Sequence, residues 1–333
     1  MTLRFESLRR SIGLCAFAAL AAVNCSSSTD SPPAVATTHP AGTITDTALI
    51  AGSAHGIAIA NDGTMLITRL DSTDLEMGRD SVFALGSKIS VGAHPIDVAI
   101  TPDSRTAFVP LIFSPHVAIV DVASGTKTGE LTVAESPLRV LVSPNNRHLY
   151  VTTSGAGADT TSTVYDFDPR TYALLDTIVV GAFANGIVFD APRNRLYVSA
   201  TGYVYEIDTA TDSVLRRIWV GGPLQDVAVK KDGSELWVAT ETDAGVQVFS
   251  LPDGAHIQSI DGTENAVGLK ITPDGAQFYV ARDIGGILAI VDASSRQVVS
   301  SLEPGLGPIR IAFNATGSRA VVTDDATGAV LIQ

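Results

Sequence analysis

The 333-residue chain has only two cysteines, Cys15 and Cys25, and both lie near its N-terminus. The rest of the chain therefore offers no disulfide, no thiolate metal ligand and no cysteine nucleophile. Aromatic residues make up only 6% of the chain, and Lys and Arg number 22 against 35 Asp and Glu. A chain this acidic repels nucleic-acid phosphates and has few rings on which bases could stack. Nucleic acid is therefore a disfavoured partner.

Long hydrophobic runs are also absent, apart from one short stretch at the N-terminus. Arg4, Arg9 and Arg10 precede an apolar segment from Ser11 to Asn24, which is too short for a helix that spans a bilayer. This pattern predicts a secretory signal peptide over residues 1–24, and hence an exported protein. Without that segment the chain has 19 Lys and Arg against 34 Asp and Glu, a formal charge of −15.

The next segment starts at Cys25 and is rich in Ser, Thr and Pro. It is too polar to pack, and we expect residues 25–42 to form a disordered tether. A cysteine between an apolar stretch and such a tether resembles a bacterial lipoprotein signal. The resemblance implies lipidation of Cys25 and a lipoprotein of the periplasm, the outer membrane or the cell surface, which meets the membrane only through its lipid anchor. Asn24 departs from that signal, which has Gly, Ala or Ser there, so ordinary signal cleavage is the alternative.

One short sequence motif occurs seven times in the remaining chain. It consists of a small apolar run, a turn with Asp, Asn or Gly, and a second apolar run that ends in a small residue. The copies begin at Ile57, Val98, Val140, Ile187, Val227, Leu269 and Ile311, at intervals of 41, 42, 47, 40, 42 and 42 residues. This period, with strand-like content, predicts an all-β fold over residues 43–333: a seven-bladed β-propeller of four-stranded antiparallel blades.

The two ends of this region predict how the ring closes. The sixth copy contains four strands, at residues 267–272, 278–281, 288–292 and 297–302, but the chain stops at Gln333, after the third strand of the last copy. Residues 49–52 resemble residues 89–92 and 218–221, where fourth strands of other copies end. We therefore expect the N-terminal strand, residues 43–52, to complete the last blade and to remove an exposed sheet edge.

The repeats also resemble a known family. Tyr150-Val151-Thr152, with Asp166 and Asp168 downstream and Val180-Gly181 at the end of the fourth strand, is similar to the YVTN family of β-propeller repeats. Pro273-Asp274-Gly275, with Tyr279-Val280-Ala281 and Val291-Asp292, shows the same likeness. The resemblance, to YncE-like propellers, covers residues 43–333. It implies the blade architecture and says little about function, because propellers host many unrelated activities.

A ligand or partner site is expected where the chain enters the first strand of each blade. These loops share one face with the loops between second and third strands, and together they surround the channel mouth. The polar and charged residues at these positions are His55, His94, Asp97, Arg139, Asn185, Gln225, Asp226 and Arg310. The alternative is that the charges form ion pairs between blades, with Asp97 facing Arg139.

Metal and catalytic chemistry have weaker support. His55, His94 and Asp97 are fewer ligands than zinc or copper sites normally use, so we predict no metal and no cofactor. No Gly-x-Ser-x-Gly nucleophile motif is present, and no catalytic residue is assigned. A lactonase-like hydrolase with its site at the channel mouth remains an alternative, which requires His55, His94, Asp97 and Asp226 to converge.

Two loops of the same face carry further interpretations. Residues 68–81 contain four carboxylates and are expected to form a mobile loop, with Leu75 and Met77 as exposed apolar contacts. The apolar loop 111–116 forms either a contact patch or a cap on the second blade through Phe113. Additional carboxylates, which make this face acidic, lie at Glu241, Asp243, Asp283, Asp324 and Asp325.

Together these features favour an interaction scaffold over an enzyme. We predict a monomeric exported propeller that binds a protein or polymer of the cell envelope. The hydrolase is the first alternative. The second is single-stranded DNA binding, which the family resemblance suggests and the negative charge opposes.

Overall fold

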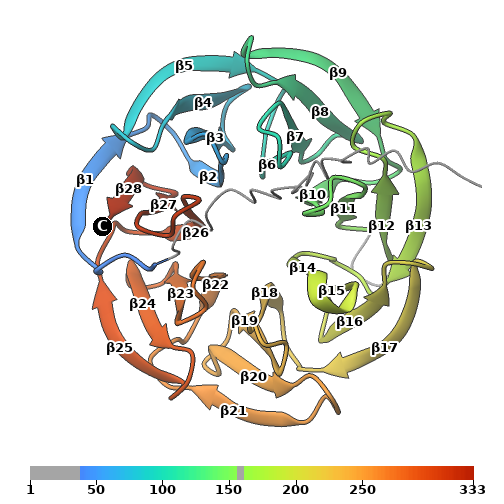
Figure 1. Ribbon diagram of the computed structural model, residues 1–333, viewed down its shortest axis with the longest axis vertical. Helices are drawn as coiled ribbons and strands as arrows, with labels where there is room; N and C mark the ends of the chain where they lie inside the picture. The colour runs from blue at the N-terminus through green and yellow to red at the C-terminus, as the bar shows by residue number, and fades with distance from the viewer. Residues whose placement is uncertain (1–37, 156–160) are drawn as a thin grey trace, which may run out of the picture. The chain divides into compact units, whose positions relative to one another are not determined.

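The computed structural model describes residues 38–155 and 161–333, which belong to one compact unit spanning residues 36–333. The expected signal peptide, Cys25 and the first part of the expected tether, up to residue 37, lie outside the described residues. The unit consists of seven four-stranded antiparallel sheets arranged as blades around a central channel (Figure 1). The predicted seven-bladed β-propeller is confirmed.

The first four blades follow one another along the chain, each running from an inner to an outer strand. Blade 1 contains β2 (Ala54–Ile59), β3 (Thr64–Arg69), β4 (Asp74–Arg79) and β5 (Ala84–Ser90); blade 2 contains β6 (Ala99–Ile100), β7 (Thr106–Leu111), β8 (His116–Asp121) and β9 (Thr126–Thr132); blade 3 contains β10 (Pro137–Val142), β11 (Leu149–Thr153), β12 (Ser162–Phe167) and β13 (Leu174–Val180); blade 4 contains β14 (Ile187–Asp190), β15 (Arg195–Ala200), β16 (Tyr203–Asp208) and β17 (Ser213–Trp219).

The last three blades repeat this order, except that the final one takes its outer strand from the start of the chain. Blade 5 contains β18 (Leu224–Val229), β19 (Glu235–Thr240), β20 (Val246–Ser250) and β21 (His256–Ile260); blade 6 contains β22 (Ala266–Ile271), β23 (Gln277–Arg282), β24 (Ile287–Asp292) and β25 (Gln297–Leu302); blade 7 contains β26 (Pro308–Phe313), β27 (Ala320–Asp324), β28 (Gly328–Ile332) and β1 (Ile44–Leu49).

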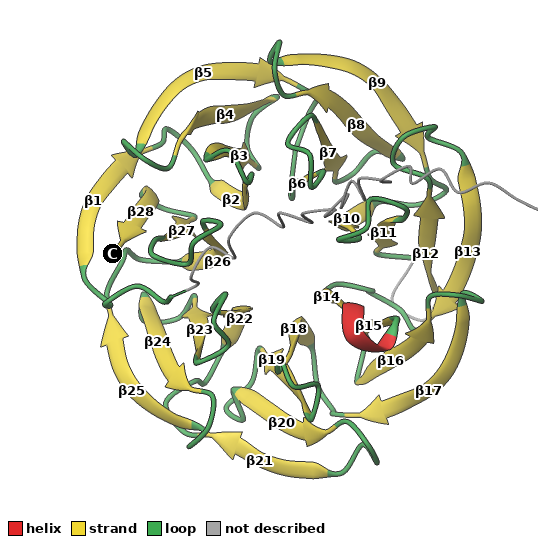
Figure 2. Ribbon diagram, viewed as in Figure 1, coloured by secondary structure: helices red, strands yellow, loops and turns green. Residues whose placement is uncertain are grey.

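Helical structure is confined, within the described residues, to one 3-10 turn, η1 (Ala191–Arg193), between β14 and β15 (Figure 2). None of the described helical segments is long and apolar enough to cross a membrane. The strand content follows from the alternating, β-branched sequence of each repeat.

Ring closure occurs as the sequence predicted. Strand β1 pairs antiparallel with β28, in a register that places Thr47 opposite Val330 and Leu49 opposite Gly328. Beyond the strand, Thr43 and Gln333 exchange two backbone hydrogen bonds of 3.0 and 2.9 Å. The first and last segments of the unit therefore lie side by side in one sheet (Figure 1).

The residues just before β1 also lie against the ring. The Thr38 backbone N–H donates to the carbonyl oxygen of Thr316 at 2.9 Å, and His39 Nδ1 lies 2.6 Å from a carboxylate oxygen of Asp274. These residues belong to the segment assigned to the tether from its composition. They meet the propeller on the face opposite the channel mouth, because Asp274 and Thr316 lie in turns between first and second strands.

The hydrophobic core is divided into seven clusters, one at each junction between neighbouring blades. Each sheet packs on both faces, so successive residues of a middle strand enter different clusters. On β3, Met65 and Ile67 pack towards blade 7 while Leu66 packs towards blade 2. No blade can bury both faces alone, which explains why the fold needs a closed ring.

Candidate functional site

The residue that precedes each repeated motif lies at the channel mouth, in or just before the first strand of its blade. In blades 3, 5 and 7 the strand register shifts next to Arg139, Asp226 and Arg310. The backbone N–H of Arg139 donates to Thr152 Oγ1 at 3.1 Å, and that of Arg310 donates to Thr323 Oγ1 at 3.2 Å. The bulge and its threonine thus fix the direction in which each arginine leaves its strand.

Glycine occupies the same position in blades 1, 4 and 6 because the next blade lies too close for a side chain. A Cβ atom on Gly186 would lie 2.6 Å from the Cα atom of Asp226, and one on Gly268 would lie 2.1 Å from the carbonyl oxygen of Ile309. Gly56 faces Asp97 in the same way. At this position of the repeat, charged side chains therefore enter the mouth from blades 2, 3, 5 and 7.

A belt of hydrogen bonds joins the blades at this level, and several of its bonds run from a side chain to a backbone group. His55 Nδ1 binds the carbonyl oxygen of Ile96 at 2.8 Å, which links blade 1 to blade 2. Arg310 donates to the carbonyl oxygen of Val267 and links blade 7 to blade 6. Thr323 Oγ1 donates to the His55 carbonyl oxygen at 2.6 Å, so blade 7 is also tied to blade 1.

The belt continues through a chain of side chains on blades 3 to 5. Arg139 Nε donates to Asn185 Oδ1 at 3.1 Å, and Asn185 Nδ2 donates to Gln225 Oε1 at 2.8 Å. Gln225 Nε2 then donates to Glu241 Oε2 at 2.6 Å. Three of the predicted site residues, Arg139, Asn185 and Gln225, are therefore brought together with Glu241, and their polar groups connect neighbouring blades.

The two carboxylates of the belt bind backbone rather than arginine. Asp97 Oδ2 accepts the N–H of Val140 at 3.2 Å, and Asp226 Oδ2 accepts that of Leu269 at 3.0 Å. Within the described residues neither carboxylate lies within 4.0 Å of a cationic group, so the interpretation of Asp97 and Arg139 as an ion pair is wrong. Burial raises the pKa of both aspartates, although each remains close enough to Arg139 to be influenced by its charge.

The two histidines at the mouth have different surroundings. Burial, with the charge of Arg139, lowers the pKa of His55 to about 4, so its ring is neutral at pH 7. His94 is exposed, binds the carbonyl oxygen of Leu70 at 2.9 Å and meets the Phe113 ring edge-on at 5.6 Å. Across residues 38–155 and 161–333, no group of three or more His, Cys, Asp or Glu side chains is arranged to hold a metal ion.

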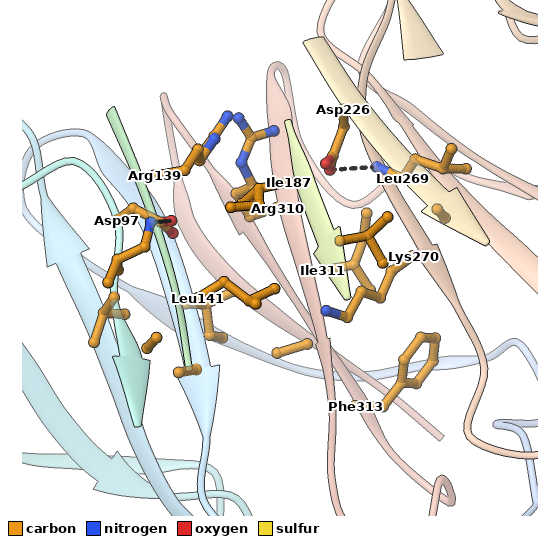
Figure 3. A pocket seen from close by; sticks show the side chains of 18 of the residues that line it. Asp97, Arg139, Leu141, Ile187, Asp226, Leu269, Lys270, Arg310, Ile311 and Phe313 are labelled. Atoms are coloured by element: carbon orange, nitrogen blue, oxygen red, sulfur yellow. Dashed lines mark hydrogen bonds between the residues drawn. The ribbon is translucent and has the colours of Figure 1, made fainter. Parts of the chain in front are cut away.

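This geometry gives no support to the hydrolase alternative. Asp97 and Asp226 belong to blades 2 and 5, on different sides of the pocket, and each is engaged by a backbone donor (Figure 3). His55 is fixed by the Ile96 carbonyl oxygen, and His94 is held by blade 1 outside the belt. A general base must instead be free to reach a substrate proton.

A cavity of about 360 Å³ lies along the channel between the first strands. Four of the predicted site residues line it: Asp97, Arg139, Asp226 and Arg310 (Figure 3). Lys270 lines it as well, and sequence reasoning missed this residue although a signal was present. Lys270 is the second residue of its repeated motif, and in the other six copies this residue is small or aliphatic, namely Ala58, Ala99, Leu141, Val188, Ala228 and Ala312.

A second cavity, of about 470 Å³, opens at the mouth over blades 5 to 7, and we call it the mouth pocket. Three predicted site residues line it, His55, Gln225 and Arg310, together with three carboxylates, Glu241, Asp283 and Asp325. Arg310 is the only Lys or Arg among the lining residues that the structure describes. The mouth pocket is therefore acidic, and the exposed Leu306 adds an apolar contact.

One of these carboxylates has a perturbed acidity. Burial raises the pKa of Asp325, and the neighbouring carboxylates of Asp324 and Asp71 raise it further. Asp324 is fully buried and accepts the backbone N–H groups of Gly307, Ala326 and Thr327. Negative charge has thus accumulated at this part of the mouth.

The interpretation of residues 68–81 as a mobile loop is wrong. Residues 74–79 form β4, paired with β3 and β5, and only residues 70–73 connect β3 to β4. Leu75 is fully buried in the core and Met77 is partly buried, so neither is an exposed contact. The carboxylates misled the prediction because one of them, Glu76, is buried within reach of Arg69 and Lys88.

The loop at residues 111–116 projects rather than folding back. Phe113 has 77% of its surface exposed, and its φ of 70° places it in the left-handed region. Its ring does not cap the core of blade 2 and touches only the rim, beside His94. The interpretation of Phe113 as a cap on blade 2 is therefore wrong, and the contact patch stays a prediction.

No family model matches the chain. It is 26% identical over 277 residues to the seven-bladed β-propeller protein Rv1057 of Mycobacterium tuberculosis, which covers 79% of this chain and 67% of that protein. It is 21% identical over 275 residues to protein YncE of Salmonella typhimurium, covering 78% of this chain and 74% of YncE.

Solved structures share the fold at lower identity. A chain of hydrazine synthase from Kuenenia stuttgartiensis superposes with a TM-score of 0.77 at 17% identity, covering 89% of this chain and 99% of that one. The β-propeller domain of Cps50 (Swd1) from Myceliophteria thermophila gives 0.71 at 15% identity, covering 87% and 98%. Fold and relatives together define this chain as a seven-bladed β-propeller, and its sequence is similar to those of Rv1057 and YncE.

Proposed function

We propose that this protein is an interaction module that binds a partner through its mouth face. The mouth face consists of the loops that enter the first strands and those that join second to third strands. The partner contributes a basic segment, such as lysine or arginine side chains of an envelope protein or the amines of a polymer. We further propose that the protein is exported and held at the membrane by a lipid on Cys25.

The observation that carries the proposal is the composition of the mouth pocket. Glu241, Asp283 and Asp325 surround a cavity of about 470 Å³ that contains a single guanidinium, from Arg310. That guanidinium already donates to the carbonyl oxygens of Val267 and Ile309. A partner's cation would therefore meet carboxylates that form no ion pair within residues 38–155 and 161–333, which favours specific electrostatic association.

The acidity of Asp325 supports the same partner chemistry. Its raised pKa reflects burial and the repulsion of nearby carboxylates, both of which disfavour the charged form. A cation bound beside Asp325 would offset that repulsion and favour deprotonation. Binding is therefore expected to strengthen as the pH rises through the pKa of Asp325, since only the ionised carboxylate attracts the partner.

A charge-removing variant of the mouth pocket tests this proposal. The triple variant Glu241→Gln, Asp283→Asn, Asp325→Asn is expected to bind an oligolysine peptide about tenfold more weakly at low ionic strength, because three partly exposed ionic contacts together contribute about 1–2 kcal/mol. Isothermal titration calorimetry measures the difference, which should shrink as salt is added.

The matched control removes the same charge from the opposite face. Asp62, Asp232 and Asp253 are exposed and lie in turns on that face, and asparagine tolerates such turn positions. The variant Asp62→Asn, Asp232→Asn, Asp253→Asn should bind the peptide within about twofold of the wild type. Equal weakening in both variants would mean that net charge, rather than the mouth pocket, attracts the peptide.

Lipid anchoring is tested separately. When the full chain is expressed in a diderm bacterium with an alkyne-labelled fatty acid, the wild type should acquire the label and fractionate with membranes. The Cys25→Ser variant should lose both properties, because the thiol that would carry the lipid is gone. An unlabelled wild-type protein would contradict the anchor while leaving the mouth pocket as proposed.

A further inference from the structure

The central cavity contains three cationic side chains that make no ion pair within the described residues. Arg139 and Arg310 enter from the bulges at the mouth, and Lys270 enters from the wall formed by β22. Figure 3 shows the amine of Lys270 reaching into the middle of the pocket. Lys270 is exposed to the channel, and in the described parts of the chain no carboxylate lies within 4.0 Å of its amine.

Arg139 supplies an independent indication that the cavity binds an acceptor group. Only 6% of the residue is exposed, and its Nε is used by Asn185. Its Nη1 atom is buried and has no hydrogen-bond partner. A buried donor without a partner is costly, and a bound acceptor would satisfy it.

The carboxylates in the cavity do not neutralise these cations by direct contact. Asp97 and Asp226 each accept a backbone N–H from the next blade. Burial raises the pKa of both aspartates, while the charges of Arg139 and Lys270 act in the opposite direction. Three cations against two such aspartates leave the cavity with a surplus of positive charge, in a protein whose net charge is −13.

The walls of the cavity below the arginines are apolar. Leu141, Val188, Ile271 and Phe313 line this part, on strands β10, β14, β22 and β26. Phe313 lies at the opposite end of the pocket from the two arginines in Figure 3. A volume of about 360 Å³ is at the small end of the range for ligand sites, so the occupant must be short.

We propose that the central channel binds a small monocarboxylate with a short apolar body, whose carboxylate is held by Arg139 and attracted by the charge of Lys270. Arg310 adds a second guanidinium at the mouth side, and the apolar body packs along the aliphatic walls towards Phe313. Charge-assisted hydrogen bonds to an oxyanion are the strongest contacts that these side chains can make. The inference goes beyond the proposed function, because the ligand and its cavity differ from the basic partner and the mouth pocket.

Isothermal titration calorimetry with hexanoate, acetate and inorganic phosphate tests the proposal on the purified protein. Saturable binding is expected for hexanoate, with acetate weaker because it fills less of the apolar wall, and with phosphate weakest because it has no apolar body. The Lys270→Met variant keeps the length of the side chain and removes its charge. It should weaken hexanoate binding about tenfold.

The control is Lys231→Met, which removes an exposed cation from a turn on the opposite face and should bind hexanoate like the wild type. The melting temperature of both variants confirms folding, and oligolysine binding should be unchanged in both. The proposal is overturned if no anion binds saturably, if Lys270→Met binds hexanoate as tightly as the wild type, or if phosphate binds more tightly than hexanoate.

Discussion

A variant without residues 43–50 is expected to lose about 5 kcal/mol or more of folding free energy, comparable to the whole stability of many domains. The deletion removes the ladder between β1 and β28 and the backbone bonds between Thr43 and Gln333. It also removes Ile50, which is buried in the cluster between blades 7 and 1. Each lost bond costs about 1 kcal/mol, and each buried aliphatic side chain costs about 2 kcal/mol.

Thermal unfolding measures this effect. The melting temperature should fall by about 10–20 °C, and the exposed edge of β28 should promote aggregation. The control appends residues 43–50 after Gln333 through a short Gly-Ser turn, so that the missing strand is supplied from the other end of the chain. That variant should recover most of the lost stability. A deletion variant that melts like the wild type would show that β1 does not close the ring.

Acid is expected to destabilise the protein through His55. Burial and the Arg139 charge lower the pKa of this histidine from 6.5 to about 4. Between these two pH values the unfolded chain binds a proton at His55 and the folded chain does not. The contribution of neutral His55 is therefore fully present above pH 6.5 and is lost as the pH falls to about 4. A shift of this size corresponds to about 3 kcal/mol.

Comparison with His55→Asn isolates the contribution. Asparagine can still donate to the Ile96 carbonyl oxygen but does not titrate, so the variant should lose less stability than the wild type between pH 6.5 and 4. Asp166 acts in the opposite direction, because burial raises its pKa to about 6, and it is common to both proteins. Urea unfolding across this range measures the difference. Parallel pH profiles would contradict the role assigned to His55.

The architecture could be predicted from sequence because every blade repeats the same physical requirement. An alternating apolar pattern returns at a nearly constant period. The last copy has only three strands, and one additional strand-like segment, residues 43–52, precedes the first copy. Packing on both faces of each sheet makes this pattern strong in all seven copies. The propeller fold, the number of blades and the closing strand could therefore all be predicted from this pattern.

The details of the mouth could be predicted only in part. The sequence placed Asp97 and Arg139 on adjacent blades, but it did not show the bulge at Arg139, next to which the Val140 N–H donates to the Asp97 carboxylate. Side-chain direction after a bulge depends on local register, which a repeat pattern does not carry. Lys270 was missed for a different reason. It occupies a regular position of the repeat, and only its charge distinguishes it from the small or aliphatic residues at that position in the other copies.

Site-specific photo-crosslinking in the native cell most directly tests whether the mouth face binds a partner. A photoreactive residue at position 283 lies in the mouth pocket, and one at position 105 lies in a turn on the opposite face. We predict one discrete crosslinked product from position 283, reduced by the additional changes Glu241→Gln and Asp325→Asn, and none from position 105. A product from position 105 alone, or none from either position, would contradict binding through the mouth face.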